Sequence, residues 1–252
     1  MTNILCTKSN SSKALEKHFA ELSLKHTQPL LVHSSLFSLV KLDNPALLLI
    51  NTLKNYLLEN TALAVPSYVF DSKEEYNPLA SVPSTGLVSK TVFNNAMGMR
   101  TYSPIHNHIF MNAEIDPASL NYTSSFGTGT DFEKFYVDDY RLLLFSTDFK
   151  TACTYLHHVE SLACVPYRKQ ITIEKKLKLS DSYSESIELA YDARISPNIK
   201  TDFNKILPLI QKASSYHESK LNGFTSYAID IRELHTIAMK RLSDSPNFFQ
   251  VT

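Results

Sequence analysis

The chain has 252 residues, of which 43% are hydrophobic, and 25 basic and 25 acidic residues give a formal net charge of zero. This length allows one large or two small domains, and the composition is sufficient for a sizeable core. A neutral chain offers no excess positive charge to a polyanion, so we expect no nucleic-acid partner.

The cysteines and the start of the chain indicate a reducing compartment. Cys6, Cys153 and Cys164 form an odd set without the Cys-x-x-Cys spacing of a metal or redox motif. The first residues lack the basic and apolar regions of a signal peptide. No apolar stretch approaches the ~20 residues needed to span a bilayer. We therefore expect a cytoplasmic protein with no disulfide framework and no membrane contact.

The N-terminal half alternates helical and strand patterns. In chain order it predicts a helix at 11–22 capped by Ser11-Ser12, a strand at 29–33, a helix at 45–57, a strand at 61–66, a long loop at 71–83, a helix at 87–97 and an extended segment at 102–112. The first strand–helix–strand unit favours parallel pairing with a right-handed crossover.

The C-terminal half continues this alternation. It predicts a central strand at 141–145, a helix at 148–163, a strand at 165–174, a hairpin or insertion at 178–200, a helix at 203–210 interrupted by Pro208, and a last helix at 229–242. No repeat or linker divides the chain. We therefore expect one α/β domain spanning residues 1–252.

The pair His157 and Glu160 is the main candidate for catalysis. In the predicted helix these residues are three apart, so their side chains lie on one face. A carboxylate that holds one imidazole nitrogen leaves the other free to accept a proton, which makes a general base. His158 is only two residues from Glu160 and points elsewhere. The alternative is an ordinary ion pair on the surface of a helix.

Polar residues follow the first predicted strand. His33, Ser34 and Ser35 stand at its carboxyl end, where side chains can hydrogen-bond a ligand that crosses the edge of an α/β sheet. The alternative is a polar turn that caps the strand.

A glycine-containing turn precedes another predicted helix. Thr130 and Glu133 have the spacing of a capping box, and a Gly-x-Gly turn before a helix can present free N–H groups to an anion. The alternative is a simple tight turn. The residues concerned are Gly127, Thr128, Gly129 and Thr130.

Two further side chains bear on the chemistry. His106 and His108 share a face of the extended segment, but no carboxylate or thiol lies at ligand spacing beside them, so we expect no metal. Cys153 lies four residues before His157 on the same face of the predicted helix. A Cys–His pair can form an acyl intermediate, but most buried cysteines are inert core residues, which favours a structural role for Cys153.

Several short motifs together resemble one known family. They are Val32-His-Ser-Ser35, Val65-Pro-Ser-Tyr68, Thr85-Gly86, Arg100 to His106 ending in Pro-x-His, Phe126-Gly-x-Gly-Thr130, Leu156-His-x-x-Glu160, Val165-Pro-Tyr-Arg168 and Ile229-Asp-Ile-Arg-Glu-Leu234. In order and spacing, from about residue 28 to about residue 243, they resemble the aminoglycoside 3-N-acetyltransferases, also called antibiotic N-acetyltransferases.

The resemblance implies a single domain with a central mixed β-sheet flanked by helices. It implies transfer of an acetyl group from acetyl-CoA to a primary amine of a sugar, without a metal, and it leaves room for a homodimer. His157 resembles the catalytic histidine and Glu160 its partner. The cofactor-side residues would be His33, Ser34, Ser35 and Gly127 to Thr130. The acceptor-side residues would be Tyr68, Arg100, His106, Tyr167 and Arg168.

The chain departs from the family pattern in two places. Thr151-Ala-Cys-Thr154 stands where the family often has Asp-Ser-Asn-Thr, and Ser103-Pro-Ile-His-Asn107 replaces His-Pro-x-His-Ser. These departures, with the neutral charge, favour an anionic, nucleotide-linked amino sugar used in surface-polysaccharide synthesis. An antibiotic-resistance enzyme acting on aminoglycosides is the alternative, and a hydrolase or a silent binding protein of the same fold is a weaker one.

Overall fold

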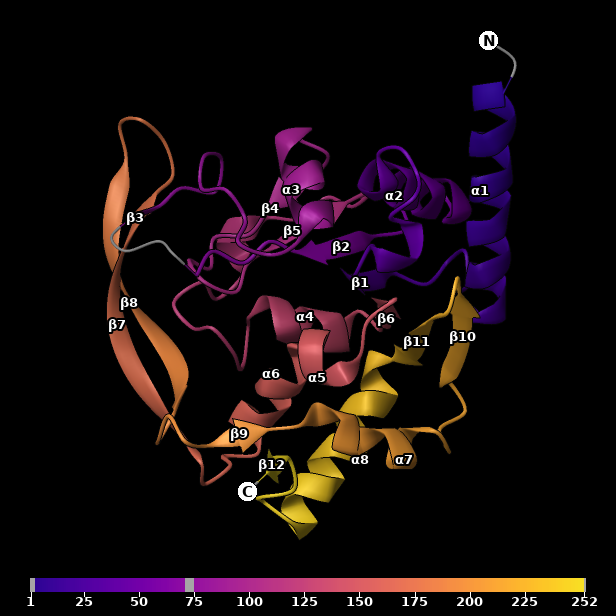
Figure 1. Cartoon of the computed structure of the whole chain (residues 1–252). Coiled ribbons are helices and arrows are strands. Elements are labelled where there is room, and N and C mark those ends of the chain that lie inside the picture. Colours follow the sequence, from indigo (N-terminus) through magenta and orange to yellow (C-terminus); the bar gives the residue numbers. More distant parts are fainter. Residues whose placement is uncertain (1–2, 71–74, 252) are drawn as a thin grey trace.

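A mixed sheet of seven strands forms the centre of the computed structural model (Figure 1), which describes residues 3–70 and 75–251. The strand order is β10-β11-β6-β1-β2-β5-β4. β1 pairs in parallel with β2 and β6, whereas the other neighbours are antiparallel. The strands are β1 (Leu30–Ser34), β2 (Leu63–Pro66), β4 (Met99–Arg100), β5 (His108–Met111), β6 (Arg141–Phe145), β10 (His217–Leu221) and β11 (Phe224–Asp230).

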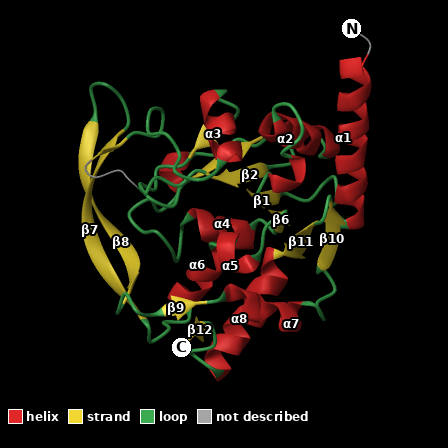
Figure 2. Cartoon of the chain, in the orientation of Figure 1, coloured by secondary structure: helices red, strands yellow, loops and turns green. Residues whose placement is uncertain are grey.

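Helices cover both faces of this sheet (Figure 2) because its central strands are apolar on both sides. Successive side chains of a strand point to opposite faces, so Leu30 and Val32 pack in one core and Leu31 in the other. The first core contains side chains of α1 (Asn3–Glu21), α2 (Pro45–Tyr56) and α3 (Leu87–Asn94). The second contains side chains of α4 (Asp131–Val137), α5 (Phe149–Ala152), α6 (Tyr155–Leu162), α7 (Leu207–Ile210) and α8 (Ile231–Asp244).

A long, curved hairpin stands beside the central sheet (Figure 1, left). It consists of β7 (Arg168–Lys178) and β8 (Ser184–Arg194), and β3 (Glu75–Tyr76) pairs in parallel with β7. The hairpin interpretation of residues 178–200 is correct only in part, because this segment supplies the turn and the second strand, whereas the first strand lies before it. The remaining elements are β9 (Lys200–Thr201), β12 (Gln250–Val251) and the 3-10 turns η1 (Phe37–Leu39), η2 (Pro117–Ser119) and η3 (Phe203–Ile206).

The expected fold class is confirmed as a single α/β domain with a central mixed sheet flanked by helices. The parallel strand–helix–strand unit and the central strand at 141–145 are present as predicted. None of the described helices is both long and apolar enough to cross a membrane.

Several predicted elements are wrong in detail. The helix expected at 148–163 is broken between α5 and α6, and the one at 203–210 divides into η3 and α7. Only the end of the 102–112 segment is a strand, β5. The sequence missed β10 and β11, so α8 begins two residues later than expected. α1 begins at Asn3 and therefore contains Ser11-Ser12, which do not cap it; residues 71–74 of the expected long loop lie outside the described residues.

Candidate active site

α6 brings His157 and Glu160 together as the spacing predicted. Nδ1 of His157 lies 2.8 Å from Oε2 of Glu160, across one turn of the helix. The Glu160 side chain is fully buried, whereas that of His157 is 26% exposed. His157 therefore reaches solvent, whereas Glu160 is enclosed by protein.

Glu160 is held from the strand that follows α6. The Tyr167 hydroxyl donates to Oε1 at 2.7 Å, and Nε of Arg168 donates to Oε2 at 2.7 Å. Burial raises the pKa of Glu160, but the hydrogen bond and charge of His157, with Arg168 and Tyr167, leave that pKa below its usual value. The carboxylate is therefore ionised, and it accepts the Nδ1 proton of His157.

This arrangement fixes the tautomer of His157. Burial lowers the pKa of His157, Glu160 partly raises it again, and Arg168 and Arg194 lower it. The net lowering keeps the imidazole uncharged at neutral pH. Because Nδ1 carries the proton that Glu160 accepts, Nε2 is left with a free lone pair. Nη2 of Arg168 also lies 2.7 Å from Nδ1, but a guanidinium can only donate, so this contact is not a hydrogen bond while Nδ1 carries the proton that Glu160 accepts.

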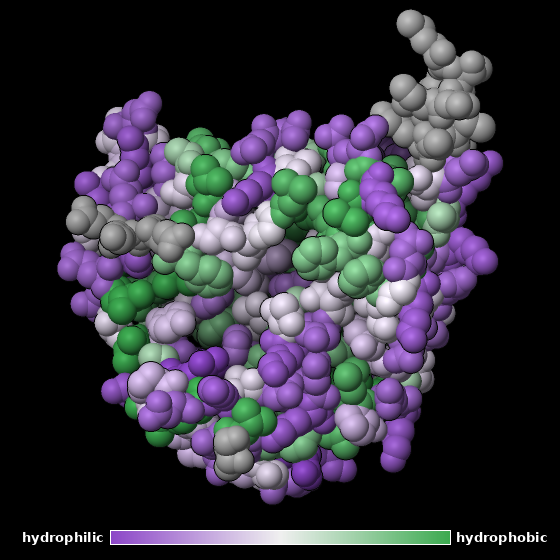
Figure 3. Space-filling view, in the orientation of Figure 1, coloured by the Kyte–Doolittle hydropathy of each residue, from purple (hydrophilic) through white to green (hydrophobic). Residues whose placement is uncertain are grey.

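His157 opens into a cavity of about 420 Å³, here called the His157 cavity. On the face drawn in Figure 3, a recess between the hairpin side and the body of the molecule is bordered by both apolar and polar residues. The hairpin and three separate loops contribute to the wall of the cavity. Its lining residues are Phe70, His106, Phe126, Thr154, His157, Arg168, Tyr191, Asp192, Ala193 and Arg194.

A second cavity of about 290 Å³, here called the Ser34 cavity, lies at the carboxyl end of β1. It contains the predicted cofactor-side residues of that strand and is rich in hydroxyl groups. Phe70 and Thr154 line both cavities, which therefore adjoin. Its polar lining residues are His33, Ser34, Ser35, Tyr68, Thr85, Ser89, Thr147, Thr151 and Thr154.

Among these side chains, His33 has an unusual environment, because it is buried and one of its ring nitrogens has no hydrogen-bond partner among the described residues. Burial lowers its pKa to about 3, and its Nε2 has no hydrogen-bond partner within the described part of the chain. The imidazole is therefore neutral and unsatisfied beside the cavity, although buried polar groups are usually paired.

Two predicted acceptor-side residues lie away from both cavities. The Arg100 guanidinium donates to the carbonyl oxygens of Ser67 and Ser81 and to Oδ1 of Asn107 at 2.8 Å. These bonds use it to fix local loops, so Arg100 does not face the His157 cavity as expected. Tyr167 is buried and acts on Glu160. Of the five predicted residues, His106 and Arg168 line the His157 cavity and Tyr68 lines the Ser34 cavity.

In the turn from Gly127 to Thr130, three of the four N–H groups that the sequence predicted to be free are already hydrogen-bonded within the described part of the chain. The N–H of Gly127 donates to Nδ1 of His158 at 3.1 Å, that of Gly129 to Oε2 of Glu133 at 2.6 Å, and that of Thr130 to the Gly127 carbonyl at 3.4 Å. The expected capping box is displaced by one residue, because Glu133 reaches Gly129 and the Thr130 side chain makes no cap. Thr128 belongs to the same turn. The turn directly follows Phe126, which lines the His157 cavity.

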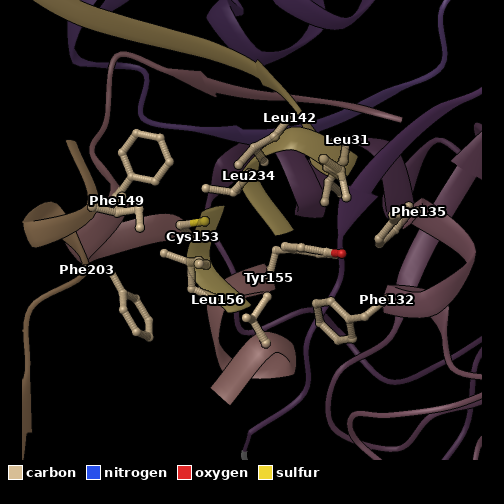
Figure 4. Close-up of a cluster of buried hydrophobic side chains, with 14 of the residues drawn as sticks. Leu31, Phe132, Phe135, Leu142, Phe149, Cys153, Tyr155, Leu156, Phe203 and Leu234 are labelled. Carbon is tan, nitrogen blue, oxygen red and sulfur yellow. The ribbon is translucent and has the colours of Figure 1, made fainter. Parts of the chain in front are cut away.

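Cys153 is not placed to act as a nucleophile. It lies in the break between α5 and α6, surrounded by Phe149, Leu156 and Phe203 (Figure 4). Burial raises its pKa to about 12, so the thiol stays protonated. The predicted shared helical face with His157 is therefore wrong, because the helix on which it rested is broken.

The described side chains that could bind a metal are not grouped into a site. His108 is bonded to Asp131, apart from His157. Within residues 3–70 and 75–251 no group of three or more histidine, cysteine, aspartate or glutamate side chains can hold a metal ion.

Most residues that line the His157 cavity were not singled out from the sequence as site residues. Phe70, Phe126 and Thr154 come from three separate segments, whereas Tyr191, Asp192, Ala193 and Arg194 all come from β8. Thr154 had a usable signal, because it ends the segment in which the family pattern has Asp-Ser-Asn-Thr. Phe70 and the residues of β8 had none, since they depend on how the hairpin and the loop after β2 pack.

Known proteins with this fold and site identify the family. The family model for aminoglycoside 3-N-acetyltransferase matches residues 31–243. No curated protein sequence matches. The chain belongs to the aminoglycoside 3-N-acetyltransferase family, and is therefore an acyl-CoA-dependent N-acetyltransferase with acetyl-CoA as its co-substrate.

Several solved structures share this fold, and three of them are described here. AAC-IIIb in a binary complex with CoASH is 15% identical, with a TM-score of 0.79, covering 92% of this chain and 96% of that chain. A variant of AAC(3)-IVa in complex with a gentamicin is 22% identical, with a TM-score of 0.76, covering 94% and 90%. YokD from Bacillus subtilis is 17% identical, with a TM-score of 0.75, covering 93% of each chain.

Proposed function

We propose that this enzyme acetylates an amino group of an aminoglycoside, with His157 as general base. The observation that carries the proposal is the free Nε2 of a neutral, carboxylate-held His157 at the wall of one cavity that adjoins a second, hydroxyl-rich cavity. The expected preference for a nucleotide-linked amino sugar in polysaccharide synthesis has no support from the relatives, whereas the family match supports the alternative.

The base performs one task in this mechanism. A sugar amine is largely protonated near neutral pH and must lose a proton to attack a thioester. Nε2 of His157 takes that proton while Glu160 stabilises the imidazolium that forms. A base positioned in this way typically contributes about 10²–10⁴-fold in rate. The nitrogen then attacks the carbonyl carbon, and the intermediate collapses with loss of the CoA thiolate.

The Ser34 cavity suits the donor. Hydroxyl groups of Ser34, Ser35 and Thr147 can hydrogen-bond the amide groups of a pantetheine arm. α3 begins beside this cavity after Gly86, and the N-terminus of a helix favours negatively charged groups. The thioester then reaches His157 across Thr154, where the two cavities meet.

The His157 cavity suits the acceptor. Asp192 is a buried carboxylate in its wall, and it can hold an ammonium group of the acceptor by a charge-assisted hydrogen bond. His106 and Tyr191 lie parallel, with ring centroids 6.0 Å apart, and offer flat faces to a sugar ring. Tyr191 and Asp192 are neighbours on β8, whereas His106 comes from the segment before β5.

The test is acetylation of an aminoglycoside panel that includes gentamicin and apramycin, with nucleotide-linked amino sugars as competitors, followed by CoA release and product mass. We expect Asp192→Asn to raise the aminoglycoside KM by about 10–100-fold, the worth of one hydrogen bond to a charged group. Asp181→Asn, at the exposed tip of the same hairpin, is the matched control. Efficient turnover of a nucleotide-linked amino sugar without turnover of any aminoglycoside would refute the proposal.

A further inference from the structure

Two exposed aromatic rings lie against each other beyond the carboxyl end of β1. Phe37 of η1 is 68% exposed and Phe224 of β11 is 40% exposed. Their ring centroids are 6.2 Å apart, and the ring planes differ by 22°. Single exposed apolar side chains are common on protein surfaces, but exposed aromatic side chains that lie together often mark a binding surface. These two residues are here called the Phe37–Phe224 pair.

The turn between β10 and β11 brings the two rings together. Asn222 and Gly223 form this turn with positive φ angles, as the tightest hairpin turns require. The side-chain amide of Asn222 donates to the Ser38 carbonyl of η1 at 2.7 Å. Phe37 directly precedes Ser38, and Phe224 directly follows the turn. The pair is therefore held in place before any ligand binds, which reduces the entropic cost of binding.

The pair lies beside the Ser34 cavity. Ser35 lines this cavity two residues before Phe37. Thr147 lines it directly after Ser146, and the N–H of Ser146 donates to Oγ of Ser226 on β11 at 2.9 Å. The start of β11 is therefore fixed next to the residues that follow β6. Each ring of the pair is attached to backbone that adjoins the lining of the cavity.

The Ser34 cavity is too small to enclose the whole donor. Its volume is about 290 Å³, whereas pockets that enclose a drug-sized ligand typically measure about 300–1,000 Å³. Acetyl-CoA carries an adenosine and phosphate groups in addition to its pantetheine arm, so the nucleotide must extend beyond a cavity that holds the arm. Phe70 is also exposed, but it lies where the two cavities meet and therefore at the thioester end of the donor.

We propose that the adenine ring of acetyl-CoA stacks on the Phe37–Phe224 pair while the pantetheine arm occupies the Ser34 cavity. The inference rests on the proposed function, which places the donor in that cavity, and it adds a site for the nucleotide end. Adenine presents a flat π-face, and stacking on aromatic side chains is a common way to bind a base. The pair contributes to donor affinity and takes no part in the transfer of the acetyl group.

The first test is the binding of CoA without an acceptor, measured by isothermal titration calorimetry. We expect Phe37→Ala and Phe224→Ala each to raise the Kd of CoA by about 5–10-fold, and Phe37→Tyr, which keeps a ring, to stay within about twofold of the wild type. Tyr183→Ala is the matched control, because it removes a ring of 52% exposure from the turn between β7 and β8. Unchanged affinity in both alanine variants, or an equal loss in the control, overturns the proposal.

The second test shows which end of the donor meets the pair. The chain contains no tryptophan, so Phe37→Trp introduces a single indole fluorophore. CoA should quench its emission, whereas pantetheine, which lacks adenine, should not. Quenching by both ligands, or by neither, overturns the assignment of the adenine to this pair.

Truncated donors extend the same comparison to turnover. In Phe37→Ala, kcat/KM for acetyl-CoA should fall by about 5–10-fold, whereas that for S-acetylpantetheine should stay within about twofold of the wild type. Equal losses with both donors would contradict the proposal. If no amine is acetylated, the proposed function fails, while calorimetry and fluorescence still decide where the adenine lies.

Discussion

Two imidazole–carboxylate pairs in this protein have the same contact distance and different surroundings. His157 and Glu160 meet at 2.8 Å on one turn of α6, and His108 and Asp131 meet at 2.8 Å between β5 and α4. The first imidazole is 26% exposed and the second is fully buried. The distance between the two side chains therefore does not distinguish a base from a structural pair.

The difference lies in the second nitrogen. Nε2 of His157 is free at the wall of a cavity, whereas Nε2 of His108 is bonded to Tyr68. A general base must reach the proton that it removes, so only the first pair can act on a substrate directly. The second can act only through the groups to which it is bonded.

Replacing the exposed imidazole should give the largest change in activity. We expect His157→Ala to lower kcat by about 10²–10⁴-fold, because the general base is lost. Its free energy of unfolding should fall by no more than about 2 kcal/mol, since the side chain is partly exposed. Steady-state kinetics and urea unfolding measure both quantities. His158→Asn, which keeps an acceptor for the Gly127 N–H, should retain most of the activity; similar losses in both variants would show that the base is assigned wrongly.

Replacing the buried imidazole should reverse this pattern. His108→Leu leaves Asp131 as a buried carboxylate without its partner, which typically destabilises a protein by about 3–5 kcal/mol. The loss of activity should be smaller than in His157→Ala when both are measured well below their unfolding transitions. Chemical denaturation with matched kinetics checks this. A stable His108→Leu protein would mean that the contact between His108 and Asp131 contributes little to stability.

Neutralising Glu160 should change the proton affinity of the base. Because Glu160 raises the pKa of His157, Glu160→Gln should move that pKa further below its usual value. The imidazole would then stay neutral to lower pH, and kcat should fall roughly tenfold or more because the imidazolium formed in the reaction loses its stabilising charge. NMR titration of His157 gives the pKa, and a rise in it would contradict the assigned hydrogen bond.

Cys153→Ala should have the smallest effect on activity. The thiol is enclosed in the core with a raised pKa, so we expect kcat within about twofold of the wild type and about 1 kcal/mol lower stability. Incubation with acetyl-CoA alone should give no acetylated Cys153 peptide by mass spectrometry. Detection of that peptide would favour a covalent route over direct transfer.

The local geometry of the proposed catalytic pair, His157 and Glu160, was predictable because it depends on a few consecutive residues. His157 and Glu160 are three positions apart, a spacing that brings both side chains to one face of a helix, even though the helix is shorter than expected. The same spacing argument failed for Cys153, because it assumed that the helix continued through residues 153 and 154. Strand β6 was predictable from its uniformly apolar sequence, whereas β10 and β11 are polar, partly exposed strands with weak patterns.

The sequence alone therefore indicated the family, the strands β1, β2 and β6, and the contact between His157 and Glu160, since each depends on neighbouring residues or on the order of motifs. Only the tertiary structure decided which polar residues reach the site. Arg100 was expected there and is instead bonded to backbone carbonyls, while Asp192 and Phe70 line the His157 cavity without any signal in the sequence. The physical reason is that a cavity wall is formed by contacts between distant segments, and periodicity reports only on neighbours along the chain.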